Sequence, residues 1–162
     1  MMMRLMRIVW VVIFLSIFPV MAFATGDGGI FLTTRNGACW SPDGSKIAFT
    51  NTPDQRKGPE EPSIWIVNLK EKTCQELSKG EMPDWSPDGN RLVFVRKGKI
   101  YTKDVRTGVE ESLLQEAESG AYPAWSPAGD RIAFSGDLTP PGIYILDLKT
   151  SQKHLVILTK TD

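Results

Sequence analysis

Short apolar runs separated by polar turns recur along this chain. Their residues are mostly β-branched, aliphatic or aromatic, which favours pleated structure, and the intervals between them leave no room for long helices. The runs that recur in phase are 47–49, 92–94 and 132–134, each followed by a further run at 64–66, 100–102 and 142–145. The pattern predicts a protein that is nearly all β.

One phrase occurs three times, as WSPDGSKIAF at 40–49, WSPDGNRLVF at 85–94 and WSPAGDRIAF at 125–134. Its Ser-Pro-Asp-Gly part has the chemistry of a tight turn, because proline presets φ and glycine accepts positive φ. The tryptophans are better explained as packing units than as a ligand-stacking row, since an aromatic ring buries a large apolar area. The positions assigned a structural role are Trp40, Pro42, Gly44, Trp85, Pro87, Gly89, Trp125, Pro127 and Gly129.

The spacing of the phrase fits a four-stranded propeller blade, which repeats every 40–50 residues or so. The predicted blades are about 38–80, 81–118 and 119–159, with fourth strands near 75–78, 110–114 and 154–158. Residues 32–40 align without a gap to 77–85, which predicts an extra outer strand at about 30–34. The expected fold is therefore all-β, a partial or open β-propeller with antiparallel blades and an added N-terminal strand.

Three blades fall short of the four to eight that close a propeller ring. The end faces would be apolar and uncovered, and such faces normally find a partner. Three arrangements stay open: a homodimeric six-bladed ring, a piece of a longer propeller, or an open arc. In a symmetric dimer the strand at 30–34 would compete with residues 155–158 of the partner for one sheet edge.

The first 24 residues have the pattern of a secretory signal peptide. Arg4 and Arg7 precede the apolar run 8–20, and Ala22 and Ala24 form a small-x-small cleavage site. We expect cleavage after Ala24, a mature domain of 25–162 without a stable membrane anchor, and a periplasmic or secreted location. A retained anchor is the alternative, which Pro19 disfavours.

Composition narrows the classes of partner. The 162 residues are 41% hydrophobic and 23% charged, with 19 basic and 19 acidic side chains, so the net charge is zero. A neutral chain lacks the attraction that drives nucleic-acid binding, and we expect no nucleic-acid partner. Export makes a disulfide between Cys39 and Cys74 worth considering, but an inner and an outer strand lie too far apart for one.

The WSPDG phrase, followed by a basic residue and an apolar-small-Phe strand, resembles the repeat of the TolB propeller, the periplasmic component of the Tol-Pal envelope system. The resemblance covers about residues 28–162 and implies a propeller fold and a role in protein binding at the envelope. The third copy, Ala128-Gly129-Asp130, departs from Asp-Gly, which weakens the role of aspartate in that turn. Similar repeats form the propellers of prolyl-oligopeptidase-like peptidases, so the phrase is specific for the fold and weak for the partner.

Reactive groups do not converge in this sequence. His154 is the single histidine, no Gly-x-Ser-x-Gly elbow occurs, and neither cysteine nor histidine spacing suggests zinc. Calcium on Asp43, Asp84 and Asp88 is disfavoured, because turn chemistry already explains two of the three. The carboxylate pairs Glu60-Glu61, Glu110-Glu111 and Glu116/Glu118 are expected to be solvated loop or outer-strand charges. We expect no enzyme activity, no catalytic residue, no metal and no cofactor.

The least repetitive stretch, 51–62, is the candidate contact surface, because long loops on a rigid β scaffold usually carry recognition. A solvated insertion is the alternative interpretation, and 136–142 is a second, shorter candidate. The predicted function is a non-enzymatic module for protein–protein interaction or scaffolding in the cell envelope. Alternatives are the propeller of a peptidase or polysaccharide-active enzyme and a homodimeric ring that binds a small ligand. The predicted partner-binding residues are Asp54, Arg56, Lys57, Glu60 and Glu61.

Overall fold

A computed structural model describes residues 37–53 and 60–158 of the chain. The predicted signal peptide and the strand expected at 30–34 lie outside these residues. Within them, no helix is long and apolar enough to cross a membrane.

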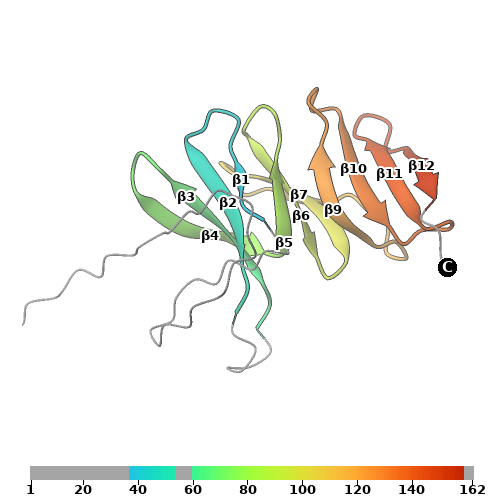
Figure 1. Cartoon of the computed structure of the whole chain (residues 1–162), viewed down its shortest axis with the longest axis horizontal. Coiled ribbons are helices and arrows are strands. Elements are labelled where there is room, and N and C mark those ends of the chain that lie inside the picture. The colour runs from blue at the N-terminus through green and yellow to red at the C-terminus, as the bar shows by residue number, and fades with distance from the viewer. Residues whose placement is uncertain (1–36, 54–59, 159–162) are drawn as a thin grey trace, which may run out of the picture.

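The described chain forms three four-stranded antiparallel sheets in sequence order (Figure 1). The first sheet contains β1 (Cys39–Trp40), β2 (Lys46–Asn51), β3 (Ser63–Asn68) and β4 (Thr73–Lys79). The second contains β5 (Glu81–Trp85), β6 (Arg91–Arg96), β7 (Lys99–Asp104) and β8 (Glu110–Ser112). The third contains β9 (Gly120–Trp125), β10 (Arg131–Gly136), β11 (Gly142–Asp147) and β12 (Lys153–Leu158). The predicted all-β, open propeller architecture is confirmed.

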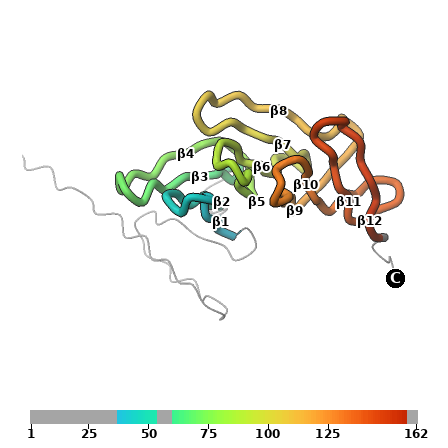
Figure 2. The backbone as a smooth tube through the Cα atoms, turned by 90° about the horizontal axis from the view of Figure 1, so that it is seen from above, coloured from blue at the N-terminus to red at the C-terminus, as the bar shows by residue number. Residues whose placement is uncertain are grey.

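Every sheet is a meander, so strands that follow one another in the chain pair with one another. Seen from above, the first strands β1, β5 and β9 lie toward the inside of an arc, and β4, β8 and β12 lie toward its outside (Figure 2). The arc is open, with the first sheet at one end and the third at the other (Figures 1 and 2).

Each sheet has a leading face, turned toward the sheet before it, and a trailing face, turned toward the sheet after it. Alternation along the strands separates the two faces. Between the first two sheets, the trailing-face residues Ala48, Ile64 and Ile66 pack against leading-face residues of the second sheet, which are Trp85, Leu92 and Phe94. These residues form the first of two core layers, each of which lies between two neighbouring sheets.

The second core layer has the same construction. Its members are Val93, Ile100, Leu114, Trp125, Ile132, Phe134, Tyr144 and Leu146. Neighbouring residues of β6 serve both layers, because Leu92 and Phe94 point to the first sheet and Val93 points to the third. The middle sheet therefore has both faces covered.

The outer strand of the second sheet is shorter than predicted. The sequence suggested a strand at 110–114, whereas β8 ends at Ser112. Beyond β8 the Leu113 amide still donates to the Ile100 carbonyl at 2.8 Å, and Leu114 is buried in the second core layer. The strand therefore ends two residues earlier than predicted, and Leu114 belongs to the core instead.

Candidate partner-binding site

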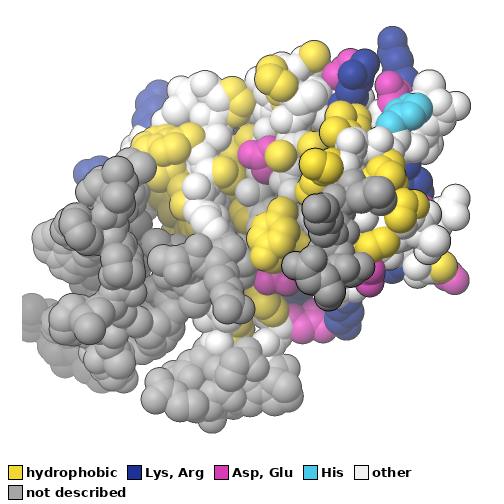
Figure 3. All heavy atoms as spheres, turned by 45° about the vertical axis from the view of Figure 1, so that its right-hand side comes forward, with side chains coloured by type: hydrophobic (Ala, Val, Ile, Leu, Met, Phe, Trp, Pro, Cys, Tyr) yellow, Lys and Arg dark blue, Asp and Glu magenta, His cyan; other side chains and the backbone are white. Residues whose placement is uncertain are grey.

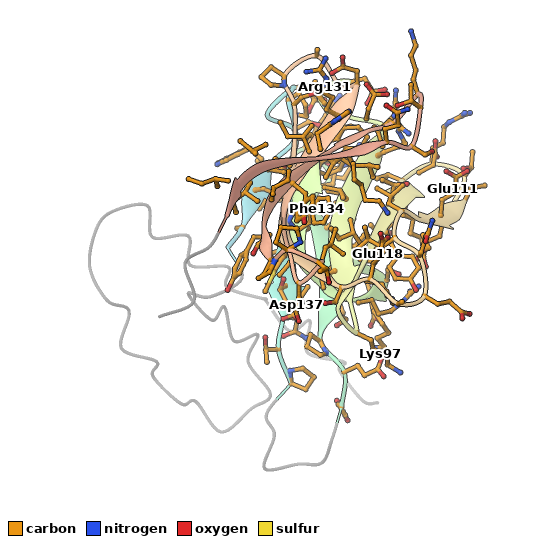
Figure 4. All side chains as sticks on the ribbon, turned by 90° about the vertical axis from the view of Figure 1, so that its right-hand side faces the viewer. Lys97, Glu111, Glu118, Arg131, Phe134 and Asp137 are labelled. Atoms are coloured by element: carbon orange, nitrogen blue, oxygen red, sulfur yellow. The ribbon has the colours of Figure 1, made fainter. Side chains whose placement is uncertain are left out.

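In all three sheets, the connections between the second and third strands lie at the same end of the strands. They join equivalent strand positions, because Asn51 pairs with Ser63, Arg96 with Lys99 and Gly136 with Gly142. We call this end the loop end; its described residues are 52–53, 60–62, 97–98 and 137–141. In Figure 4, Lys97 and Asp137 lie toward the loop end, while Arg131 lies toward the opposite end.

Backbone hydrogen bonds fix the loop end to the crossings between sheets. The amide of Gly80 donates to the carbonyl of Pro62 at 2.8 Å, and the amide of Gly120 donates to the carbonyl of Gly98 at 2.8 Å. The amide of Asp137 donates to the carbonyl of Ser119 at 3.2 Å. Each connection therefore starts or ends on a held backbone, which suits a surface that must present side chains in fixed positions.

Glu61 forms an ion pair that links the 52–62 connection to the 97–98 turn. Its carboxylate lies 2.7 Å from the ammonium of Lys97, in the tight turn of the second sheet. The hydrogen bond and charge of Lys97 hold the pKa of Glu61 below its usual range. Both side chains are exposed, so the pair adds little to stability, and its value is to place an acidic and a basic group together on the surface.

The predicted partner-binding residues divide into two groups. Asp54, Arg56 and Lys57 lie outside the described residues. Glu60 and Glu61 are exposed at the end of the 52–62 connection. Sequence reasoning missed Lys97, although the equivalence of positions 51, 96 and 136 in the repeat placed its turn beside the long connection.

The SPDG turns are held by their own side chains. The Ser41 hydroxyl donates to Asp43 Oδ1 at 2.6 Å and accepts from the Lys46 amide at 2.8 Å. In the second sheet, Ser86 and Asp88 make the same 2.6 Å bond. The hydroxyl of Ser41, with the amide and hydroxyl of Ser45, lowers the pKa of Asp43 to about 2. These aspartates are turn residues whose oxygens are already engaged.

In the third turn, an aspartate at a different position accepts the equivalent hydrogen bond from serine. Asp130, two positions later than its counterparts, accepts from the Ser126 hydroxyl at 2.9 Å, and Ser126 accepts from the Arg131 amide at 3.1 Å. The expected loss of the aspartate role is therefore offset by a neighbouring carboxylate. Gly129 retains the positive φ, 74°, that Gly44 and Gly89 show at 68° and 71°.

Successive turns also touch one another. A Cβ added at Gly89 would lie 3.7 Å from Pro42, and one at Gly129 would lie 3.6 Å from Pro87. The prolines and glycines of the phrase thus form a contact row between sheets. Pro127, the proline of the last turn, has no following sheet among the described residues.

The repeat tryptophans have unequal surroundings. Trp85 is 4% exposed and Trp125 is 9% exposed, each on a leading face that another sheet covers. The Arg91 guanidinium lies 4.9 Å from the ring centroid of Trp125. Trp40 occupies the same position in the first sheet and is 48% exposed.

Two of the carboxylates expected to be solvated are ion-paired links between sheets. Glu110 pairs with Arg96, lies 3.5 Å from the Lys103 ammonium and accepts from the Ser78 hydroxyl of the first sheet at 3.1 Å. Glu118, on the crossing to the third sheet, pairs with Lys153 of β12. These cations hold the pKa values of both groups below the usual range despite partial burial.

Asp84 and Cys39 occupy the same position in β5 and β1 and are both partly buried. Asp84 Oδ2 accepts from the Trp125 amide at 2.8 Å, which links the second sheet to the third. Burial raises the pKa of Asp84, and burial raises the pKa of the Cys39 thiol to about 12. A thiol with so high a pKa is a poor nucleophile, and its Sγ donates to the Pro83 carbonyl at 3.2 Å. Cys39 and Cys74 are both free, on the opposite edge strands β1 and β4.

Other candidates for chemistry are sparse in residues 37–53 and 60–158. His154 is exposed on β12. No group of three or more His, Cys, Asp or Glu side chains in this part of the chain is placed to hold a metal ion. A polar groove of about 230 Å³, below the usual range for ligand pockets of roughly 300–1,000 Å³, runs between the second and third sheets and includes Arg91, Thr102 and Asp147.

Asp84 and Asp88 should respond to pH in opposite directions. Burial raises the folded-state pKa of Asp84, so its contribution to stability is full below about pH 4 and is lost as pH rises through the folded pKa. An Asp84→Asn side chain still offers an oxygen to the Trp125 amide. We therefore expect the variant to gain stability relative to the parent chain between about pH 3 and pH 7, measured by urea unfolding at each pH.

Asp88→Asn is the matched control. Hydrogen bonds from Ser86 and Asn90 lower the pKa of Asp88, so its contribution is present above about pH 4 and is lost as pH falls through the folded pKa. The Asp88→Asn variant should lose stability relative to the parent as pH rises. Two variants with the same pH trend would contradict this assignment.

Comparison with known proteins agrees with the geometry. The family described as the dipeptidyl peptidase IV (DPP IV) N-terminal region matches residues 56–119. The Tol-Pal system protein TolB of Alcanivorax borkumensis is 42% identical over 60 residues, which cover 35% of this chain and 13% of that protein.

Among solved structures, TolB from Acinetobacter baumannii superposes with a TM-score of 0.66 at 22% identity, over 78% of this chain and 33% of that one. An acylaminoacyl peptidase of Pyrococcus horikoshii gives a TM-score of 0.58 at 18% identity, over 72% of this chain and 23% of that one. An oligogalacturonate lyase in complex with manganese gives 0.57 at 19% identity, over 74% and 38%. The chain thus spans about a third of the A. baumannii TolB structure. Its three sheets form an open, TolB-like propeller.

Proposed function

We propose that this chain is an exported, non-enzymatic propeller module that binds a protein partner in the periplasm or cell envelope through its loop end. The TolB relative and the secretory pattern of residues 1–24 support the location. The contacts of the carboxylates support the non-enzymatic role. The aspartates of the first two turns hydrogen-bond within their own turns, and Glu110 and Glu118 bind groups of neighbouring sheets.

The observation that carries the proposal is the difference between equivalent connections at the loop end. The second sheet needs only residues 97–98 to join its strands, while the first uses 52–62 between strands in the same register. The extra residues are therefore unnecessary for closing the hairpin. The ion pair of Glu61 with Lys97 sets the end of this insertion against the neighbouring turn, so that both can contact one partner.

A loop exchange tests this directly. Replacing residues 52–62 with Lys-Gly, the turn of the second sheet, should preserve the fold because Asn51 and Ser63 would face one another as Arg96 and Lys99 do. We expect an unchanged circular dichroism spectrum and a loss of at least about tenfold in the yield of a partner cross-linked in intact cells.

The control changes the opposite end of the same sheet. Lys70→Glu with Lys72→Glu alters two exposed charges in the turn between β3 and β4 and should leave cross-linking unchanged. Equal cross-linking by the loop exchange and the parent chain would refute the contact surface.

A second candidate function is the propeller part of a peptidase or polysaccharide-active enzyme. The match of residues 56–119 to the dipeptidyl peptidase IV N-terminal region favours it, as do the peptidase and lyase structures with this fold. A coding sequence that continues in frame into a catalytic domain would support this candidate, and an independent stop codon after Asp162 would oppose it.

A further inference from the structure

The third sheet has two different faces. Its trailing face carries exposed hydrophobic side chains such as Ile157, which is 60% exposed, and Figure 3 shows hydrophobic side chains gathered on the side of the molecule that the third sheet presents. Its leading face is turned to the second sheet, and the polar groove of about 230 Å³ lies between these two sheets. The side chains that line this groove indicate what it can hold.

Both sheets contribute polar side chains to the groove. The second sheet supplies Arg91, Thr102 and Glu111, and the third supplies Asp147 and the following turn residue Ser151. Leucine side chains make up the apolar part of the lining. In Figure 4, Glu111 lies at the outer side of the molecule, apart from the labelled residues of the loop end. The groove and the loop end are therefore separate surfaces.

Thr102 places a hydroxyl without a protein partner in this groove. The residue is 4% exposed, and no side-chain hydrogen bond within residues 37–53 and 60–158 includes its hydroxyl. In the same part of the chain, the polar side-chain atoms that are both unpaired and inaccessible to solvent are the indole nitrogens of Trp85 and Trp125. The Thr102 oxygen is not among them, so its accessible surface lies in the groove that it lines. A water molecule or a ligand in the groove must complete this hydroxyl, because buried polar groups are almost always hydrogen-bonded.

The repeat shows that the fold itself does not require a polar residue at this position. The equivalent residue is Ile66 in the first sheet and Ile145 in the third, in the same register with the preceding strand. Ile66 is 4% exposed and packs in the first core layer. Threonine in the second sheet therefore replaces apolar burial with a hydrogen-bonding group, which favours a role in binding.

Arg91 is a second group with unused hydrogen-bonding capacity. Its guanidinium lies 4.9 Å from the centroid of the Trp125 ring, and no ion pair in the described part of the chain includes it. A guanidinium that lies over an aromatic ring keeps the N–H donors at its edge available for oxygen atoms. The indole thus holds Arg91 in place while its donors stay free to bind a ligand in the groove.

The charges of the lining restrict the ligand. Asp147 Oδ1 accepts from the Lys149 and Thr150 amides at 3.0 and 2.9 Å, and these contacts hold the pKa of Asp147 below its usual range. An anionic ligand would meet the carboxylates of Asp147 and Glu111, and a cationic ligand would meet Arg91. The groove therefore suits an uncharged ligand that both donates and accepts hydrogen bonds.

We propose that this groove binds an uncharged hexose. Hydroxyl groups of the sugar accept from Arg91 and Thr102 and donate to Asp147, and its C–H groups lie against the leucines of the lining. The volume of about 230 Å³ limits the ligand to a single ring, since pockets for drug-sized ligands hold roughly 300–1,000 Å³. A free amino acid is also neutral overall, but its ammonium group needs a buried carboxylate, whereas Glu111 is exposed and Asp147 already engages one oxygen with its own turn.

An amide NMR titration of the full chain, purified as a bacterial host processes it, tests the site. D-glucose, D-galactose and D-mannose are added separately at millimolar concentration. We expect at least one of them to shift the amide resonances of Thr102, Ser112 and Asp147 and to leave those of the 97–98 turn in place. The proposal fails if none of the three sugars shifts these resonances, or if alanine shifts them and the sugars do not.

Substitutions in the groove assign the contacts. Thr102→Val keeps the shape of the side chain without its hydroxyl and should raise the dissociation constant at least about fivefold, while Thr102→Ser restores the hydroxyl and should stay within about twofold of the parent. Arg91→Lys keeps the charge but loses the planar set of donors, and should also weaken binding at least about fivefold.

Ser135→Ala is the control for these variants, because Ser135 lies on the trailing face of the third sheet. It should bind the sugar as the parent chain does. Undiminished binding by Thr102→Val or by Arg91→Lys, or weakened binding by Ser135→Ala, would contradict the assignment of the site.

This proposal is independent of the proposed function. The exchange of residues 52–62 for Lys-Gly should leave the sugar-induced shifts unchanged even where it abolishes partner cross-linking. Conversely, loss of sugar binding in Thr102→Val with cross-linking retained would leave the loop-end proposal intact.

Discussion

Trp85→Ala should lower the free energy of unfolding by about 3–5 kcal/mol, the range for removing a buried aromatic side chain. Trp85 is 4% exposed and sits in the core layer between the first two sheets with Ala48, Leu92 and Phe94. Its indole nitrogen has no hydrogen-bond partner among the described residues, so the loss is one of packing and of the cavity that remains. Urea unfolding followed by circular dichroism measures it.

Tyr122→Asn provides the comparison. Tyr122 is also aromatic but is 64% exposed, and asparagine tolerates its positive φ of 53°. This change should alter the unfolding free energy by less than about 0.5 kcal/mol. If Trp85→Ala lowers the unfolding free energy no more than Tyr122→Asn does, the assignment of Trp85 to the core is wrong.

Gly80→Ala should destabilise the chain by about 2–5 kcal/mol, through backbone strain and overpacking together. Gly80 has a φ of 141°, and a Cβ there would lie 2.7 Å from both the Val95 carbonyl oxygen and the Phe94 ring. The carbonyl belongs to the backbone of β6 and cannot rotate away. The clash would push the crossing between the first two sheets off the edge of β6.

Gly37→Ala is the matched control for this glycine. No heavy atom lies within 4 Å of a Cβ at Gly37. We expect a change within about 0.5 kcal/mol by the same urea measurement. A Gly80→Ala variant as stable as Gly37→Ala would show that β5 can shift without loss.

The three sheets could be predicted from the sequence because the Trp-Ser-Pro phrase repeats the same local physics each time. Turn chemistry, strand propensity and alternation are properties of a few neighbouring residues. The period of 40–45 residues then identified the architecture.

Contacts between sheets were beyond the same reasoning. The partners of Glu110 include Ser78, 32 residues earlier, and Lys153 pairs with Glu118 across 35 residues. A carboxylate pair in a strand gives no sign of a cation that the next sheet supplies. Leu114 was placed in a strand for the same reason, because its burial depends on the third sheet.

The candidate site was only partly accessible to prediction. The length of the 52–62 connection is visible in the sequence, but its neighbour Lys97 follows from sheet packing. Trp40 was grouped with the other two tryptophans because its local phrase is theirs. Its exposure depends on what lies beyond the first sheet, which no local pattern encodes.

Each sheet packs only against the sheets next to it in the chain. This arrangement affects how such chains can change length during evolution. Each junction is built from the same positions, so excision of the middle unit would bring Ala48, Ile64 and Ile66 against Trp125, Ile132 and Phe134, a set that resembles their present covering. Duplication would insert a unit whose two flanks suit its new neighbours. A gene of this kind can gain or lose whole units by recombination while the rest of the interior stays as it was.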